Sequence, residues 1–402
     1  MFHFNRHDDY GRPLDPADAA MLGPEGLAKA ERFLAQREDH AVTPMHTLPR
    51  LAAELRVGAI HVKDEGQRLG LGSFKALGGA YAVACLALDH AAARLGRPVD
   101  MSELTMPDVR ALAQDLTFAC ATDGNHGRSV AQGAAFVGAK SKIFIHSGVS
   151  DGRAAAIAGF GAEIIRVTGT YDDSVAEAAR VADEKGWAIV SDTSWPGYEH
   201  IPGLVAQGYT ALVGEALRQL AEPPTHVFVQ AGVGGIAAAV AGHLALRFGA
   251  QRPKVIVVEP ARAACLYATA AAGHLVKVPH GEPTVMAMLE CYEPSRIAWR
   301  VLARVADCFM TVEEEDAVDI MNRLARPLAG DPAIVAGESG GVGLAGLIRV
   351  MRDPSIAAQL QLDRNARIFV INTEGATDPM VYRTLVGKDP QEIAATIARG
   401  TA

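Results

Sequence analysis

A lysine near the start of an apolar helix is the residue of this chain best suited to covalent chemistry. Lys75 follows the turn Leu71-Gly72-Ser73-Phe74, and apolar residues recur after it at helical spacing. A positive charge in the first turn opposes the helix dipole, and the apolar neighbours Phe74 and Leu77 add a desolvation cost. These surroundings predict a neutral amine, the form that reacts with aldehydes. The alternative is a surface lysine whose stem packs on the helix.

A glycine turn between a strand and a helix is suited to hold a phosphate group. The apolar run 226–231 predicts a buried strand, and Gly232-Val233-Gly234-Gly235 follows it and opens an apolar helix. Convergent backbone N–H groups and a helix N-terminus attract an anion. The alternative is a tight turn without a ligand. Dinucleotides and nucleoside triphosphates are disfavoured, because neither Gly-x-Gly-x-x-Gly nor Gly-x-x-x-x-Gly-Lys-Ser/Thr occurs at a suitable place.

Two acidic residues stand where ligand contacts gather in α/β folds. Asp123-Gly124-Asn125-His126-Gly127 follows the predicted strand 117–121 and precedes a helix expected to begin near Arg128, while Asp192 follows the predicted strand 188–191. Polar groups at the carboxyl ends of parallel strands commonly bind ligands. The alternatives are an Asx turn at 123, a structural histidine at 126 and a helix N-cap at 192.

Two hydrolase interpretations fail on the order and spacing of residues. Gly337-Glu338-Ser339-Gly340-Gly341 matches the nucleophile elbow Gly-x-Ser-x-Gly, but that fold needs a histidine after the serine, and the last histidine here is His280. The thirteen histidines include no His-Glu-x-x-His and no close Cys/His set. We therefore expect no metal site.

The elements that must position these residues alternate between strands and helices. Such alternation predicts an α/β fold built from parallel sheets, and nine strands are better divided between two lobes with a ligand cleft between them. The polar stretch 96–114 is expected to be an insertion with a short helix. The predicted strands are 60–63, 117–121, 142–146, 163–167, 188–191, 226–230, 255–258, 308–311 and 367–371, and the main helices are 75–93, 173–185, 204–220 and 234–248.

Composition limits the possible partners. The chain has 402 residues, of which 49% are hydrophobic and 21% charged, and a net charge of -8. These values favour a folded protein of two to three domains and disfavour nucleic-acid and membrane partners. Five cysteines without a Cys-x-x-Cys pair fit a reducing compartment, so we expect a cytoplasmic protein; a bridge between Cys265 and Cys291 is the minority interpretation.

Taken together, six separated motifs occur in the order typical of one enzyme group. The chain resembles the fold-type II pyridoxal-phosphate enzymes, the group of tryptophan synthase β and threonine dehydratase. Within that group, the acidic motifs around Asp123, Asp192, Glu338 and Glu374 look like the diaminopropionate ammonia-lyase family. The six motifs are Lys63-Asp64-Glu65, Ser73-Phe74-Lys75, Thr122 to Gly127, Gly232 to Gly235, Val257-Val258-Glu259-Pro260 and Thr373-Glu374-Gly375.

The resemblance implies a role for each residue of the site. Lys75 would carry pyridoxal 5'-phosphate covalently, Asn125 would contact the ring hydroxyl and Thr373 the pyridine nitrogen. The remaining cofactor contacts would be Phe74, Glu338 and the phosphate cradle of Gly232, Val233, Gly234 and Gly235, and the substrate contacts would be Ser73, Thr122, Asp123, Gly124, His126 and Asp192.

The resemblance also implies an activity and an assembly. The expected reaction is α,β-elimination of 2,3-diaminopropionate through an aminoacrylate to pyruvate and two ammonia, with Lys75 as base for the L substrate and Asp123 for the D substrate. Asp192 would hold the β-ammonium or give a proton to the leaving amine. A small mobile domain, 78–190, would lie within a large domain of 1–77 and 191–402, in a homodimer. The alternatives are a serine, threonine or 3-hydroxyaspartate dehydratase and a non-catalytic homologue that binds the cofactor.

Overall fold

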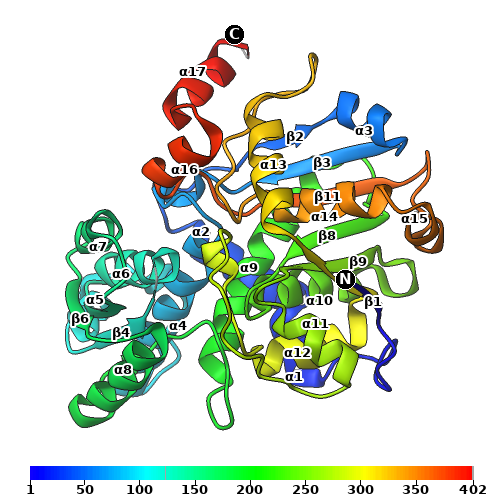
Figure 1. The fold of residues 1–402 in the computed structure, drawn as a ribbon. Coiled ribbons are helices and arrows are strands. Elements are labelled where there is room, and N and C mark those ends of the chain that lie inside the picture. The colour runs from blue at the N-terminus through cyan, green and yellow to red at the C-terminus, as the bar shows by residue number, and fades with distance from the viewer. Residues whose placement is uncertain (123, 401–402) are drawn as a thin grey trace.

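The chain forms two sheets in a computed structural model that describes residues 1–122 and 124–400, with no account of the side chains from 396 onward. In Figure 1 the smaller sheet and its helices lie on the left and the larger sheet crosses the right. The larger sheet has the order β1-β10-β9-β8-β11-β3-β2. Its strands are β1 (Phe2–Phe4), β2 (Met45–Thr47), β3 (Ala59–Asp64), β8 (His226–Gln230), β9 (Lys254–Pro260), β10 (Cys308–Val312) and β11 (Arg367–Asn372).

Parallel pairing in the centre of this sheet buries it on both faces. Val227 and Val229 belong to the apolar cluster on the side of α9, α10 and α12, whereas Phe228 belongs to the cluster on the side of α13 and α14. Such continuous apolar strands are typical of parallel sheets covered by helices on both faces. The helices of this part are α1 (Pro16–Leu22), α2 (Pro24–Leu34), α3 (Pro49–Leu55), α9 (His200–Gln219), α10 (Gly235–Phe248), α11 (Cys265–Ala272), α12 (Arg296–Val305), α13 (Glu314–Ala325), α14 (Val342–Met351), α15 (Pro354–Leu360), α16 (Pro379–Val386) and α17 (Pro390–Gly400), with short 3-10 turns at Arg68–Gly70, Gly249–Gln251 and Ala287–Leu289.

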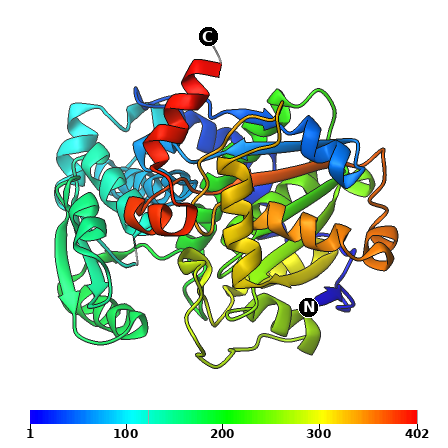
Figure 2. The same ribbon diagram turned by 45° about the horizontal axis from the view of Figure 1, so that its top comes forward.

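The smaller sheet is wholly parallel and comes from one continuous segment. Its strand order is β6-β5-β4-β7. Figure 2 shows the same two groups from another direction, with α17 projecting at the C-terminal end. The strands are β4 (Thr117–Ala121), β5 (Lys140–His146), β6 (Glu163–Val167) and β7 (Ala188–Ile189), and the helices are α4 (Lys75–Leu95), α5 (Pro107–Ala113), α6 (Asn125–Val137), α7 (Asp151–Ala158) and α8 (Tyr171–Lys185), with a 3-10 turn at Met101–Glu103.

All nine predicted strands are present, and two short ones were missed. β1 and β2 have three residues each and pair antiparallel with β10 and β3. Segments this short carry no period-2 pattern, so the sequence did not reveal them. The α/β fold class is confirmed, and residues 96–114 do contain a short helix, α5.

Helix α4 runs between the two sheets and is mostly buried. It packs against α6 on one side and α9 on the other. By length and composition alone it could cross a membrane, but 67% of its apolar window is buried inside the protein. Its apolar character is therefore that of a core helix, and it places Lys75 at its first turn.

Candidate active site

The loop that carries Lys75 is tied to the far end of the chain. The N–H of Phe74 donates to the carbonyl of Thr373 at 3.0 Å, and the N–H of Gly375 donates to the carbonyl of Gly72 at 2.9 Å. These two bonds join the start of α4 to the segment that follows β11. The lysine consequently lies at the carboxyl edge of the larger sheet, where parallel α/β folds place their ligands.

Lys75 forms an ion pair with Asp192. Its Nζ contacts Asp192 Oδ2, and the two side chains are 21% and 16% exposed. Burial alone would lower the pKa of Lys75, but the Asp192 carboxylate outweighs it and the pKa is raised overall. The expectation of a neutral amine is therefore wrong for the cofactor-free protein, because the helix dipole is weaker than a carboxylate in contact.

Asp192 is an ionised partner and not a helix cap. Burial disfavours its charge, yet the Lys75 ammonium holds the pKa of Asp192 well below its usual range. The next helix, α9, begins at His200 with Glu199 at its N-cap. The N-cap interpretation of Asp192 is therefore wrong, and the loop after β7 delivers this carboxylate to Lys75.

The glycine turn forms an open cradle at the N-terminus of α10. Gly234 has a φ of +99° and α10 has no side-chain N-cap. A Cβ at Gly232 would lie 2.8 Å from the Cys291 Sγ, and one at Gly234 would lie 3.0 Å from the Cβ of Ala298. A side chain at 232 would have to displace Cys291, and one at 234 would also be strained by the positive φ. The uncapped N–H groups at the helix start suit an anion. The five cysteines, all within the described residues, form no disulfide.

The hydroxyl of Thr373 is held by a glutamine that the sequence did not reveal. Gln230 Nε2 lies 2.5 Å from the Gly340 carbonyl, 2.9 Å from Thr373 Oγ1 and 3.1 Å from the carbonyls of Ser339 and Ile371, and these four acceptors share its two protons. Since Thr373 accepts from Gln230, its own proton is directed elsewhere, at present toward the Ser339 carbonyl at 3.4 Å. Gln230 is the last residue of β8 and escaped notice because it ends an otherwise apolar strand.

Asn125 contacts a buried carboxyl group from the other sheet. Its Nδ2 donates to Glu374 Oε2 at 2.7 Å. Burial raises the pKa of Glu374 to about 8, and the nearby Glu338 adds to the shift. Burial also raises the pKa of Glu338, against the attraction of Arg153. Glu374 stands in the motif Thr373-Glu374-Gly375, but only its first residue was expected in the site.

The turn before α6 is organised by Thr122. Its Oγ1 accepts from the N–H of Gly124 at 3.0 Å and from that of Gly127 at 3.1 Å. These bonds start α6 at Asn125, three residues before the expected position, because the hydroxyl satisfies N–H groups of the first turn. Asp123, expected as the second base, lies outside the described residues.

Two further residues predicted to contact the substrate are His126, which has a hydrogen-bond partner in the protein, and Ser73, which has none among the described residues. His126 is buried and its Nε2 contacts the Val190 carbonyl at 2.8 Å, while burial lowers its pKa, so it is a neutral residue with a structural contact. Ser73 is also buried, and its Oγ has no hydrogen-bond partner among the described residues. Ser73 is therefore the hydroxyl available to a ligand.

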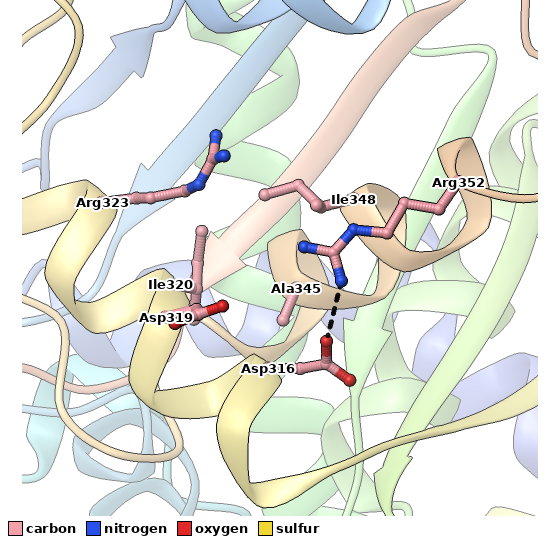
Figure 3. A pocket seen from close by; sticks show the side chains of 7 residues that line it. All are labelled: Asp316, Asp319, Ile320, Arg323, Ala345, Ile348 and Arg352. Carbon is pink, nitrogen blue, oxygen red and sulfur yellow. Dashed lines mark hydrogen bonds and ion pairs between the residues drawn. The ribbon is translucent and has the colours of Figure 1, made fainter.

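A separate hollow on the outer side of the larger sheet has none of these features. It lies between α13 and α14, where the side chains of Asp316 and Arg352 approach to 3.5 Å (Figure 3). Its volume is about 10 Å³, roughly the space of one water molecule. None of the predicted site residues lines it, so it is not a second candidate for the site.

Comparisons with known proteins agree over nearly the whole chain. A family model described as pyridoxal-phosphate dependent enzyme matches residues 37–374. A diaminopropionate ammonia-lyase of Salmonella typhimurium is 39% identical over 375 residues, which cover 91% of this chain and 92% of that protein. The Escherichia coli diaminopropionate ammonia-lyase, solved with an aminoacrylate-PLP azomethine reaction intermediate, has a TM-score of 0.85 at 36% identity and 96% coverage of both chains. Its complex with D-serine has a TM-score of 0.86 at 35% identity with the same coverage.

Proposed function

Because the chain belongs to the pyridoxal-phosphate dependent enzymes and, within them, to the diaminopropionate ammonia-lyases, we propose that the Lys75 and Asp192 pair is its catalytic centre. The enzyme eliminates ammonia from 2,3-diaminopropionate with pyridoxal phosphate as cofactor. The observation that supports the proposal is a lysine in contact with a carboxylate at the edge of a sheet, next to an uncapped glycine cradle.

The residues at this edge fit the cofactor. The cradle suits a phosphate, and the buried Ser73 Oγ and His126 Nδ1 have no protein partner among the described residues, as expected where a ligand completes the site. When bound, pyridoxal phosphate supplies an electron sink for the pair left on Cα after proton removal. The proposed cofactor contacts are Lys75, Phe74, Asn125, Glu338, Thr373 and the backbone of Gly232, Val233, Gly234 and Gly235.

Thr373 is suited to a pyridine nitrogen that carries no proton. Gln230 donates to its oxygen, so the hydroxyl has a proton left to donate and meets an acceptor best. A protonated ring nitrogen would need a carboxylate instead. Asn125 lies opposite, on α6, where its amide can leave Glu374 and donate to the ring hydroxyl.

Asp192 holds the substrate's β-ammonium or gives a proton to its leaving amine. Beside the Lys75 ammonium its pKa is depressed, so the carboxylate is ionised near neutrality. An ionised carboxylate makes charge-assisted hydrogen bonds to an ammonium group. If Lys75 held the cofactor, its amine would no longer pair with Asp192 as an ammonium group, and the substrate's second amine would take that place. A hydroxy amino acid brings no such cation, which favours the diamino substrate.

The first test is Lys75→Ala. The variant loses the covalent attachment, so the visible absorbance band of the bound cofactor and pyruvate formation are both expected to disappear. Absorbance spectra with and without DL-diaminopropionate measure this, with wild type as reference and ammonia counted per pyruvate. Diaminopropionate must give two ammonia per pyruvate, and faster pyruvate formation from serine, with one ammonia each, would indicate a hydroxy substrate. A variant that keeps the band would remove Lys75 from its role.

A second test concerns the two enantiomers. We assign removal of the Cα proton to Lys75 for the L substrate and to Asp123 for the D substrate, since two bases on opposite faces allow both to react. Asp123→Asn is therefore expected to lower kcat/KM for D-diaminopropionate about 100-fold or more and to spare the L substrate. Equal losses on both substrates would contradict the assignment.

The assembly and the location remain part of the proposal. We propose a homodimer in the cytoplasm, with residues 78–190 as a small mobile domain. The four-stranded sheet, all of whose strands lie within that segment, supports the division. The small and large parts meet through polar contacts at the site, among them Asn125 with Glu374.

A further inference from the structure

Tyr209 has a buried hydroxyl that finds no acceptor among the residues that the structure describes. It lies on α9, is 2% exposed, and its OH has no hydrogen-bond partner among the described residues. Leaving a buried hydroxyl unpaired costs about 1–3 kcal/mol, so such groups usually have a partner in the working protein. None of the roles assigned above uses this residue.

The ring of Tyr209 is fixed from the side of α4. It meets the Phe74 ring edge to face, with centroids 4.8 Å apart. A Cβ at Gly78 would lie 2.5 Å from Cε1 and 2.7 Å from Cζ of the tyrosine. Only glycine at 78 leaves room for the phenol, one turn after Lys75. The hydroxyl therefore cannot swing away from the start of α4 without moving the helix.

The opposite edge of the ring faces the phosphate cradle. A Cβ at Gly235 would lie 3.8 Å from Cε2 of Tyr209, in ordinary contact. The hydroxyl thus lies between the first turn of α4 and the N-terminus of α10. Burial raises the pKa of Tyr209, against the opposing influence of Lys75, so the phenol stays protonated and serves as a donor, not as an acid or base.

We infer that the Tyr209 hydroxyl donates a hydrogen bond to the phosphoryl group of the cofactor, in addition to the backbone cradle of 232–235. The inference rests on the proposed function, because it assumes the same cofactor. It adds a side-chain contact to a site otherwise made of main-chain N–H groups. An anionic acceptor beside the cradle would satisfy the Tyr209 hydroxyl, which has no partner among the described residues.

The test is the affinity of Tyr209→Phe for two cofactor forms. The purified enzyme is resolved from its cofactor and titrated with pyridoxal phosphate or with pyridoxal, which lacks the phosphoryl group. A hydrogen bond to a charged group predicts that the Kd for pyridoxal phosphate rises about tenfold or more, while the Kd for pyridoxal is unchanged. The control is Tyr382→Phe, since Tyr382 also has a buried, unpartnered hydroxyl but packs in a separate cluster.

Each other outcome overturns the inference. An unchanged Kd for pyridoxal phosphate means that the hydroxyl has no ligand there. Equal losses for both forms place its acceptor at the ring or at Lys75 instead. Without cofactor, Tyr209→Phe should unfold at the same urea concentration as wild type. A lower unfolding midpoint would show that the hydroxyl already has a hydrogen-bond partner within the protein. If the wild-type protein binds neither pyridoxal phosphate nor pyridoxal, the proposed function itself is wrong.

Discussion

At the scale of single residues, the site separates two kinds of carboxyl group. Asp192 touches a cation, and its pKa is depressed, so it is charged at neutral pH. Glu374 accepts from the Asn125 amide and the Thr377 hydroxyl, which carry no charge, and burial raises its pKa to about 8. Both are acidic side chains in one site, but their neighbours give them opposite charge states. Groups whose surroundings separate their pKa values in this way are typical of catalytic sites.

The raised pKa of Glu374 predicts a pH-dependent stability. In the cofactor-free protein its contribution is fully present below the unfolded pKa near 4.5 and is lost as the pH rises through about 8. Glu374→Gln, which keeps an acceptor for Asn125, should remove that loss. In urea unfolding between pH 5 and 9, the unfolding free energy of Glu374→Gln is expected to increase relative to that of wild type as the pH rises. The control Glu25→Gln, at an exposed position, should show the same pH dependence as wild type. Parallel curves for Glu374→Gln and wild type would contradict it.

At the scale of elements, a buried charge network holds β3 and the turn after it against α9. Lys63 Nζ lies 2.5 Å and Arg68 Nη2 2.8 Å from the same Glu215 oxygen, and Glu65 pairs with Arg68 from the other side. All four side chains are buried. This network fixes the segment that leads into the Lys75 loop.

Glu215→Gln tests how much this network contributes. Removing one charge leaves two buried cations with a single carboxylate, which should cost about 3 kcal/mol of unfolding free energy at pH 7. Arg68 holds the pKa of Glu215 near 2 despite burial. The difference in unfolding free energy between wild type and Glu215→Gln should therefore shrink as the pH falls from about 4.5 toward 2. Glu31→Gln is the control, because Glu31 on α2 forms a surface ion pair with Arg218 of α9, the helix that also carries Glu215. It should cost less than about 1 kcal/mol. A similar loss in both variants would show that burial is irrelevant.

Element types were predictable from the sequence, whereas several contacts were not. Apolar runs and glycine turns marked every central strand and the cradle, because local patterns determine them. The sequence did not indicate roles for Gln230, Tyr209 and Glu374. Gln230 ends an apolar strand, Tyr209 lies within a helix, and Glu374 stands in a motif in which only the neighbouring Thr373 was given a role. Their partners are distant in the chain, and only the folded topology brings them together. The charge of Lys75 was mispredicted for the same reason: Asp192 is 117 residues away.

At the scale of the whole molecule, an arginine on α7 connects the part of the chain around the smaller sheet with the part around the larger sheet. Arg153 Nη2 lies 3.5 Å from Glu338 Oε1, and its Nε lies 4.0 Å from Asp378 Oδ2. Arg153 belongs to the smaller part and both carboxylates to the larger. Together with the Asn125 and Glu374 bond, this contact spans the site. If the proposed small domain moves away from the larger part, both contacts must break.

Arg153→Gln should therefore loosen the small domain without unfolding it. The expected result is faster amide hydrogen exchange in α7, measured by mass spectrometry on the cofactor-free protein. Arg180→Gln is the matched control, since the ion pairs of Arg180 within the described part of the chain are with Glu177 and Glu184 of its own helix α8. It should leave α7 unchanged. Unaltered exchange in α7 of Arg153→Gln would mean that this bridge does not restrain the domain.

The hydrogen bonds between the Gly72 to Phe74 loop and the Thr373 to Gly375 segment have a consequence for biosynthesis. A ribosome releases residue 75 long before residue 375, so the reactive lysine emerges with its anchoring partner still unsynthesised. Nascent chains that lack residues 373–375 lack the partners of both hydrogen bonds, so we expect their lysine loop to be unanchored. We therefore expect capture of the vitamin only when translation is nearly finished, and none by products truncated before this segment.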